Sequence, residues 1–228
     1  MDLTALNPMQ RQAAETLEGP LLILAGAGSG KTRTVTYRIA NLIAHGVQPW
    51  HILALTFTNK AAKEMRERVE KLVGADAGDM WIGTFHSVCV RVLRRDIEKL
   101  GYRREFAIYD EDDRMTVIKA AARAMALDDK EYPPKALKAM ISDAKNRLLT
   151  PAEWLRETGD NARNRNFSEV YERYEHTLRG NNALDFDDLL LKTLELFAGH
   201  PPVLEYYQNR FDYVLVDEYQ DTNAAQYQ

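Results

Sequence analysis

The sequence is poor in cysteine: Cys89 is the single thiol among 228 residues. One thiol cannot build a disulfide framework, which excludes the small disulfide-rich secreted proteins and fits a reducing compartment. The opening residues MDLTALNPMQ contain neither a basic stretch nor an apolar stretch, so we expect no signal peptide. No apolar run approaches the roughly 20 residues needed to span a bilayer. We therefore expect a cytoplasmic protein.

A surplus of positive charge is also missing. The formal net charge is −4, so the total charge does not indicate a nucleic-acid partner. Local patches rather than the total decide phosphate binding, so such a partner is not excluded. The hydrophobic fraction of 45% and the charged fraction of 28% are ordinary for a soluble globular protein. The length allows one large domain or two smaller ones.

Internal repeats and low-complexity linkers are absent as well, but the pattern of the chain changes twice. The first hundred residues alternate short apolar runs with helical periodicity, which predicts parallel βαβ units. The predicted strands are 20–26, 51–57 and 80–85. The predicted helices are 30–44, 60–73 with Asn59 as N-cap, and 88–100.

No strand is predicted between residues 101 and 182, where amphipathic helical patterns follow one another. A helix over 185–198, capped by Asp185, and a buried strand over 211–218 come next. The fold class is therefore α/β, with a parallel sheet interrupted by an all-helical insertion. The predicted domains are 1–100 with 183–228, and the insertion 101–182. The helices predicted in the insertion are 110–127, 134–149, 151–158 and 167–179.

The stretch AGAGSGKT at 25–32 follows a predicted strand and opens a predicted helix, which is the context of a phosphate-binding loop. Small residues let backbone N–H groups converge on phosphate oxygens, and the helix N-terminus adds partial positive charge. Lys31 can reach the β- and γ-phosphates, and Thr32 can offer its hydroxyl to Mg²⁺. Ala25 departs from the glycine usual at the first position. The rival dinucleotide pattern needs a third glycine where Lys31 stands.

A phosphate loop needs an acid that holds magnesium. The strand YVLV is followed by Asp217 and Glu218. Asp217 would hold Mg²⁺ directly or through water, and Glu218 would polarise the attacking water. Two surface acids after an edge strand would look the same in isolation, and the phosphate loop upstream favours the catalytic interpretation.

Taken in order, these motifs resemble superfamily 1A DNA helicases of the UvrD, Rep and PcrA type. The resemblance covers the whole chain and includes the alanine at the first loop position. It implies a RecA-like domain, called 1A, with the helical insertion 1B. The stretches that carry it are LNPMQRQAA (6–14), AGAGSGKTR (25–33), LALTFTNKAAKEMRERV (53–69), GTFHS (83–87), ALDFDDLL (183–190) and VDEYQDTN (216–223).

The resemblance implies ATP and Mg²⁺ as cofactors. Gln10 would read the adenine edge, Arg33 would lie close to the nucleotide, and Thr32 and Asp217 would hold the metal. Lys31 and Glu218 would act in catalysis. The expected nucleotide-binding residues are Gln10, Ala25, Gly26, Ala27, Gly28, Ser29, Gly30, Lys31, Thr32 and Arg33.

Single-stranded DNA and its junctions with duplex are the partners that the resemblance implies. The stretches TFTNK and GTFHS each end a predicted strand, where ligands of open α/β sheets gather. Phe57, Phe85 and His86 offer flat faces on which bases can stack. Aromatic residues at strand ends are commonly part of the core, and for Phe85 both roles, base stacking and core packing, remain open. The candidate phosphate donors are Thr56, Asn59, Lys60 and Thr84.

Side chains of the insertion are expected to have structural roles, in its core or on its solvated surface. The aromatic side chains of Tyr109, Trp154, Tyr171 and Tyr174 are expected in its core. A solvated face is expected for its cluster of basic residues, with contact to duplex phosphates as the less favoured alternative. These basic residues are Lys135, Lys138, Lys145 and Arg147.

The family's rule makes the parent protein an ATP-dependent 3′–5′ helicase in DNA repair or replication. The chain stops soon after Asp217 and Glu218, so we expect the 228 residues to bind nucleotide weakly and to unwind nothing. Alternatives are a nucleotide-binding scaffold without catalysis and a RecB- or AddA-type helicase–nuclease subunit. A P-loop kinase is disfavoured by the acid pair followed by YQDTN.

Overall fold

The computed structural model describes residues 1–26, 28–74 and 79–228. The chain divides into two compact units: Met1–Val88 with Leu204–Asp221, and Cys89–Val203 with Thr222–Gln228. We call them the sheet unit and the helical unit. No helix within the described ranges is long and apolar enough to cross a membrane.

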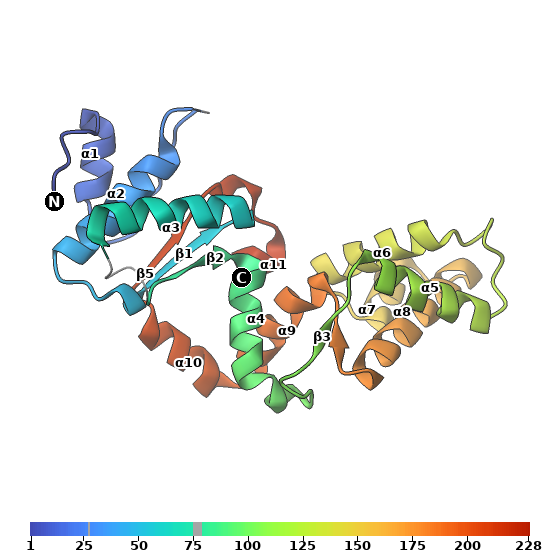
Figure 1. Cartoon of the computed structure of the whole chain (residues 1–228). Coiled ribbons are helices and arrows are strands. Elements are labelled where there is room, and N and C mark those ends of the chain that lie inside the picture. Colours follow the sequence, from blue (N-terminus) through green and yellow to red (C-terminus); the bar gives the residue numbers. More distant parts are fainter. Residues whose placement is uncertain (27, 75–78) are drawn as a thin grey trace. The chain divides into compact units, whose positions relative to one another are not determined.

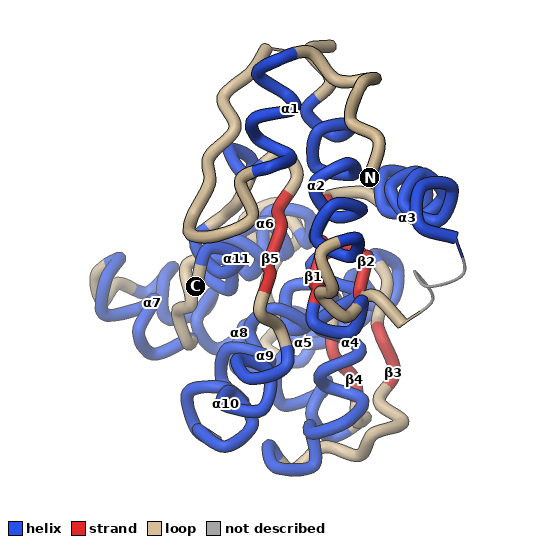
Figure 2. Tube along the Cα trace, turned by 90° about the vertical axis from the view of Figure 1, so that its left-hand side faces the viewer, coloured by secondary structure: helices blue, strands red, loops and turns tan. Residues whose placement is uncertain are grey.

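The sheet unit contains a parallel sheet of order β2-β1-β5 (Figure 2). Two helices, α2 and α3, lie beside the sheet (Figure 1). Their apolar side chains, among them the fully buried Ile39 and Met65, share one core with side chains of the strands. The elements of this unit are α1 (Pro8–Glu15), α2 (Lys31–Ala44), η1 (Pro49–His51), β1 (Ile52–Thr56), α3 (Asn59–Val73), β2 (Trp81–Thr84), β5 (Tyr213–Val216) and η4 (Tyr219–Asp221). The helix α4 (Phe85–Asp96) begins in it, and α10 (Pro201–Arg210) ends in it.

The strand predicted over residues 20–26 is wrong. These residues form no strand, and the side chains of Leu22 and Leu24 are 65% and 86% exposed. A short apolar run alone does not make a strand, because its backbone needs a neighbouring strand to pair with. Here β5 pairs with β1 on one side, and Val214 of β5 is 57% exposed.

Three smaller expectations also need correction. Thr58, not Asn59, caps α3, because the Thr58 hydroxyl accepts a hydrogen bond from the Ala61 N–H at 3.1 Å. The helix α10 lies where no helix was predicted, and it begins at Pro201 and Pro202, where proline's missing N–H has no partner to lose. A short strand, β3 (Ala107–Ile108), lies where none was predicted and pairs in parallel with β4 (Ala183–Leu184).

The helical unit has a core of aromatic and aliphatic side chains. Tyr171 and Tyr174 are buried, Trp154 packs on Phe167 with ring centroids 4.2 Å apart, and Tyr109 lies against the same core, so the predicted core aromatics are confirmed. The elements of the unit beyond the short β3–β4 pair are η3 (Ile97–Leu100), α5 (Glu111–Ala124), α6 (Pro134–Asn146), α7 (Pro151–Thr158), α8 (Ala162–Gly180), α9 (Phe186–Gly199) and α11 (Ala224–Tyr227).

The domain boundaries predicted at residues 101 and 182 stay a prediction. The compact helical unit begins at Cys89 and extends to Val203, so it takes in most of α4 and all of α9. Asp185 caps α9 as predicted, with its carboxylate accepting the Asp188 N–H at 2.8 Å.

Candidate functional site

The glycine-rich loop ends where α2 begins. Gly30 is the N-cap of α2 and has a φ of +85°, a left-handed conformation that a side chain would strain. Gly28 is also left-handed, with a φ of +75°. Gly30 has no side chain with which to cap this helix N-terminus, so the partial positive charge of the helix is available to an anion.

Lys31 lies across this loop. Its ammonium donates to the Ala25 carbonyl oxygen at 3.1 Å and lies 4.0 Å from the Glu218 carboxylate. The Ser29 hydroxyl donates to the Gly26 carbonyl oxygen at 2.6 Å, which closes the loop on itself. The loop therefore holds a cation beside the acid that follows β5. Ala27, expected among the nucleotide-binding residues, lies outside the described residues.

Thr32 and Asp217 are brought together from opposite ends of the chain. The Thr32 hydroxyl donates to Asp217 Oδ2 at 3.1 Å across a separation of 185 residues. Asp217 is 7% exposed, and its N–H continues the sheet by donating to the Leu55 carbonyl oxygen. The helix that opens with Lys31 is thereby tied to the strand that ends in the acids.

The oxygen pair of Thr32 and Asp217 suits magnesium. Mg²⁺ binds oxygen ligands at 2.0–2.1 Å in octahedral geometry, so adjacent ligands lie about 2.9 Å apart. The 3.1 Å between these two oxygens is close to that separation. Protein sites for Mg²⁺ commonly supply one or two oxygens and leave the remaining positions to phosphates and water. The residues present fit the ion.

Glu218 has an unusual backbone. Its φ is +55°, in the left-handed region that non-glycine residues rarely adopt. Strained conformations of this kind cluster at functional sites. Its side chain is 42% exposed and accepts a hydrogen bond from the Gln220 amide. The carboxylate is therefore accessible, while the Asp217 carboxylate beside it is buried.

Two further nucleotide candidates lie next to the loop. Gln10 belongs to α1, and its amide Nε2 donates to the Ser29 carbonyl oxygen at 2.8 Å. Arg33 is exposed on α2, with its guanidinium 5.8 Å from the centre of the Tyr37 ring. Gln10 thus contacts the loop directly, and Arg33 projects from the first turn of the helix that follows it.

The candidate DNA residues lie at the carboxyl ends of two neighbouring strands. In the register of β1 and β2, Thr56 is opposite Thr84, so TFTNK and GTFHS begin side by side. Asp217 follows β5 at the same edge. A parallel sheet places all three strand ends together, which is where ligands of open α/β sheets bind.

These candidates differ in exposure. Thr56, Thr84 and Phe85 are buried, and the Thr56 hydroxyl donates to the Thr58 carbonyl oxygen at 3.1 Å. The Phe57 ring lies 5.4 Å from that of Phe85. The candidates with accessible surface are Phe57 and His86, which are half-buried, and Asn59 and Lys60, which are exposed.

Sequence reasoning missed a buried charge cluster in the helical unit. Lys145, expected on a solvated face, is 1% exposed, and that expectation is wrong. Its ammonium lies 2.6 Å from Glu175, 3.0 Å from Asp185 and 2.8 Å from Asp188. The signal available in the sequence was DFDD, three acids in a segment otherwise rich in leucine.

The cluster raises the pKa values of Lys145 and Asp188 and lowers the pKa of Asp185, where burial is outweighed by the attraction of Lys145 and Arg114. Burial lowers the pKa of Lys145, but the carboxylates of Asp188, Asp185 and Glu175 outweigh it and raise that pKa well above its ordinary value. Burial raises the pKa of Asp188 to about 7, against the attraction of Lys145. A second cation, Arg114, bonds Asp187 at 3.1 Å and the Tyr174 hydroxyl at 3.2 Å.

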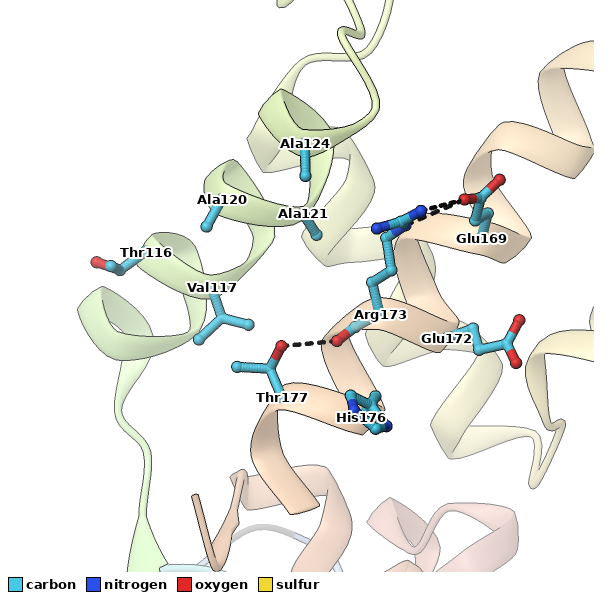
Figure 3. A pocket seen from close by; sticks show the side chains of 10 residues that line it. All are labelled: Thr116, Val117, Ala120, Ala121, Ala124, Glu169, Glu172, Arg173, His176 and Thr177. Carbon is cyan, nitrogen blue, oxygen red and sulfur yellow. Dashed lines mark hydrogen bonds and ion pairs between the residues drawn. The ribbon is translucent and has the colours of Figure 1, made fainter. Parts of the chain in front are cut away.

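A groove of about 580 Å³ runs between α5 and α8 of the helical unit (Figure 3). Small side chains such as Ala120 and Ala124 line its α5 side, and charged side chains such as Glu172 line its α8 side. Arg173 donates to Glu169 at 2.6 Å along α8. None of the predicted nucleotide or DNA residues lines this groove.

A glycine-rich loop that opens a helix, beside a parallel strand ending in an acid pair, defines the class of RecA-like P-loop proteins. The chain belongs to the UvrD/REP helicase family, because residues 6–228 match the family model of the UvrD/REP helicase N-terminal domain.

Relatives with assigned names agree with this membership. The chain is 52% identical over 226 residues to the ATP-dependent DNA helicase PcrA of Bacillus subtilis and 51% identical over 226 residues to that of Staphylococcus aureus strain Mu50. It is 51% identical over 223 residues to the PcrA helicase of Staphylococcus epidermidis. These matches cover 97–99% of the chain, which spans about 30% of the relatives' length.

Proposed function

We propose that the chain is the ATP-binding part of an ATP-dependent DNA helicase that hydrolyses ATP to move 3′ to 5′ along single-stranded DNA in repair or replication in the cytoplasm. The observation that carries the proposal is the hydrogen bond between Thr32 and Asp217. It supports the proposal because it joins the two motifs, 185 residues apart, that would form the nucleotide site. The names of the PcrA relatives support the same activity.

In this proposal each residue of the site has one task. The Lys31 ammonium leaves the Ala25 carbonyl to pair with the β- and γ-phosphate oxygens. The Thr32 hydroxyl and the Asp217 carboxylate would hold Mg²⁺, which would supply positive charge beside the phosphates. Glu218 accepts a hydrogen bond from the water that attacks the γ-phosphorus, while the bond to the β–γ bridging oxygen breaks. Its exposed carboxylate is accessible to that water.

Single-stranded DNA is the proposed partner along the carboxyl edge of the sheet. Phe57 and His86 would stack on bases, and Lys60 and Asn59 would contact phosphates. The buried Thr56, Thr84 and Phe85 would act by shaping this edge, since their side chains are enclosed by the protein. Sequence-independent contacts of this kind suit an enzyme that moves along a strand.

The nucleotide site is tested by titrating a fluorescent ATP analogue with Mg²⁺ into the wild type and Lys31→Ala. We expect the variant to lose at least tenfold in affinity, because it removes a charge-assisted contact of roughly 1.5–3 kcal/mol. Lys63→Ala is the matched control, since Lys63 has a 79% exposed side chain on α3. Equal affinity of the wild type and Lys31→Ala would contradict the proposal.

The DNA role is tested by binding a labelled oligonucleotide to the wild type, Phe57→Ala and His86→Ala. Loss of a stacked base weakens binding by about 1–3 kcal/mol for each side chain. We expect the 228-residue chain alone to show little DNA-stimulated ATP turnover and no unwinding. Strong stimulation by DNA would show that this chain is sufficient for coupling and would overturn that expectation.

A further inference from the structure

The acid pair is followed by a short segment that leads into α11. The Asp217 N–H donates to the Leu55 carbonyl oxygen at 2.9 Å, which fixes the start of this segment to the sheet. Glu218 comes next, with its left-handed φ of +55°, and the Asp221 N–H donates to its carbonyl oxygen at 2.9 Å in a turn. Strained backbone of this kind persists only where the surrounding structure holds it. What holds the far end of the segment therefore bears on the position of Glu218.

The far end of the segment is held by Asn223, the N-cap of α11. Its side-chain oxygen accepts from the Gln226 N–H at 2.8 Å, and its own N–H donates to the Gln226 side chain at 3.0 Å. Its Nδ2 donates to Asn146 Oδ1 of α6 at 3.2 Å. Ala225 is 6% exposed, and α11 lies against α9. Both polar atoms of the Asn223 side chain are thus engaged, one in the cap and one on α6.

The Asn146 amide is itself fixed. Its Nδ2 donates to the Ser142 carbonyl oxygen at 2.9 Å, which orients the amide and leaves Oδ1 to accept a hydrogen bond. The next residue toward the start of α6 is Lys145, which is 1% exposed and lies 2.8 Å from Asp188 in the buried ion cluster. This end of α6 is therefore held by a hydrogen bond and by ion pairs, and it gives α11 a firm anchor.

The segment between the two fixed ends is short. The chain passes from the sheet unit to the helical unit between Asp221 and Thr222. Only residues 218–222 separate Asp217, bonded to the sheet, from Asn223, bonded to α6. Each residue has two soft backbone dihedrals, so a segment of this length leaves Glu218 little conformational freedom once both ends are fixed.

We propose that Asn223, through its bond to Asn146, is a positioning residue for the carboxylate of Glu218. This role rests on the proposed function, in which Glu218 accepts a hydrogen bond from the attacking water. Asn223 contacts neither the nucleotide nor that water in this role, but it limits the backbone conformations open to Glu218. The bond therefore affects the rate of ATP hydrolysis and leaves ATP binding unchanged, because the nucleotide is bound by Lys31 and Thr32 of the other motif.

Two variants remove the bond from opposite sides. Asn146→Ala removes the acceptor and leaves the cap of α11 intact. Asn223→Ser removes the donor and keeps a side-chain oxygen that can cap the helix. Asn161→Ser is the matched control, because it makes the same change at the N-cap of α8, where the Asn161 side chain accepts the Asn164 N–H at 2.9 Å.

Hydrolysis is measured on the 228-residue chain with radiolabelled ATP and Mg²⁺ under single-turnover conditions, and ATP affinity is measured by calorimetry. We expect Asn146→Ala and Asn223→Ser each to slow hydrolysis about two- to tenfold, the effect of one neutral hydrogen bond, with ATP affinity unchanged. The double variant should be no slower than either single variant, because both remove the same bond. Asn161→Ser should match the wild type in rate and in affinity.

Three results would overturn the inference. Wild-type rates in both variants would show that the bond does not act on hydrolysis. Slowing by Asn223→Ser alone would show that the effect does not depend on Asn146. An ATP affinity that falls by the same factor as the rate would show a general loss of the site instead of a change at Glu218.

Hydrogen exchange follows the segment without any nucleotide. The amides of residues 218–223 should exchange faster in Asn146→Ala and Asn223→Ser, and those of α9 should exchange as in the wild type, which also shows that the helical unit remains folded. Equal exchange of residues 218–223 in the variants and the wild type would contradict the anchoring role.

Glu218→Gln separates failure of the inference from failure of the proposed function. If the wild type and Glu218→Gln hydrolyse ATP at equal rates, the proposed role of Glu218 is wrong, whatever the exchange of residues 218–223 shows. If Glu218→Gln is slower but Asn146→Ala and Asn223→Ser are not, the proposed function stands and only the inference is wrong.

Discussion

The two units of this chain differ in the apolar and charged side chains that they leave exposed. The sheet unit leaves Leu22, Leu24 and Val214 more than half exposed, and the side chain of Glu218 is 42% exposed. The helical unit buries Phe167, Tyr171 and Tyr174 almost completely, and it also buries Lys145 with Asp185 and Asp188. One unit thus encloses large aromatic side chains and an ion cluster, and the other leaves apolar and charged side chains exposed to solvent.

The physical reason lies in how the charged groups of each unit are partnered. A buried ion pair is tolerated only when its remaining hydrogen bonds are satisfied, and α9 supplies them by presenting Asp185 and Asp188 in one capping box. In the sheet unit, Lys31 donates to the Ala25 carbonyl oxygen of the loop that we propose as the nucleotide site. The ions of the helical unit serve structure, and those of the sheet unit are accessible to a ligand.

The largest expected effect is the loss of Lys145. Lys145→Ala removes the buried cation that Asp185 and Asp188 share, and breaking a buried ion pair typically costs about 3–5 kcal/mol of unfolding free energy. Hydrogen exchange of α6, α8 and α9 would measure this in the helical unit separately from the sheet unit. Lys135→Ala on the same helix is the control, because Lys135 is exposed and should change little. Equal exchange in both variants would show that the cluster does not hold the unit together.

A matched pair of leucines sharpens the contrast in apolar burial. Leu137 is 2% exposed in the core of the helical unit, so Leu137→Ala should cost about 2–5 kcal/mol. Leu24 is 86% exposed in the sheet unit, so Leu24→Ala should change the unfolding free energy by less than about 0.5 kcal/mol. Urea unfolding followed by circular dichroism measures both. A large loss in Leu24→Ala would mean that residues 20–26 are buried in solution.

The charge cluster also predicts a pH dependence. The pKa of Asp188 is about 7 in the folded chain and near 3.8 when unfolded, so between these values the unfolded state loses a proton that the folded state keeps. The contribution of Asp188 to stability therefore falls as pH rises from about 4 to about 7. Asp188→Asn imitates the protonated form and should reduce this fall. Urea midpoints at pH 5 and pH 8 test it, and an unchanged difference between the two midpoints in the variant would refute it.

Among the variants that remove a contact, the smallest expected loss of stability lies in the sheet unit. Thr32→Val removes the hydroxyl that donates to Asp217, which should cost about 0.5–1.5 kcal/mol of stability. Binding of ATP with Mg²⁺ should suffer far more than folding does, because the hydroxyl is also a proposed metal ligand. Thr32→Ser keeps the hydroxyl and should restore both properties. A stability loss as large as that of Lys145→Ala would erase the contrast between the two units.

Local patterns predicted much of this fold correctly. The helix over 151–158, the cap Asp185 and the strands β1, β2 and β5 follow from periodicity, capping residues and apolar runs, and these signals act within a few residues of one another. The prediction of a strand at 20–26 was wrong because a strand forms only beside a neighbouring strand, which local patterns do not specify. The prediction that Lys145 lies on a solvated face was wrong for the same kind of reason, because its ion-pair partners come from α8 and α9.

Some features of the candidate site could also be predicted from the sequence, and others could not. Lys31, Thr32, Asp217 and Glu218 could be proposed from the sequence, because the residue types required for phosphate and magnesium chemistry occur in short, specific motifs. The burial of Thr56, Thr84 and Phe85 could not be read from the motifs that contain them. A motif states which groups are present, and exposure depends on what the rest of the chain packs against them.

The sequence by itself determined the family, the phosphate loop and the acid pair, because each is encoded in contiguous residues whose chemistry is specific. Only the tertiary structure decided that Thr32 donates to Asp217, that Gln10 bonds the Ser29 carbonyl, and that Lys145 is buried among carboxylates. These contacts join residues from 19 to 185 positions apart. Hydrogen bonds and ion pairs act over a few ångströms, so only the folded chain brings their partners within reach.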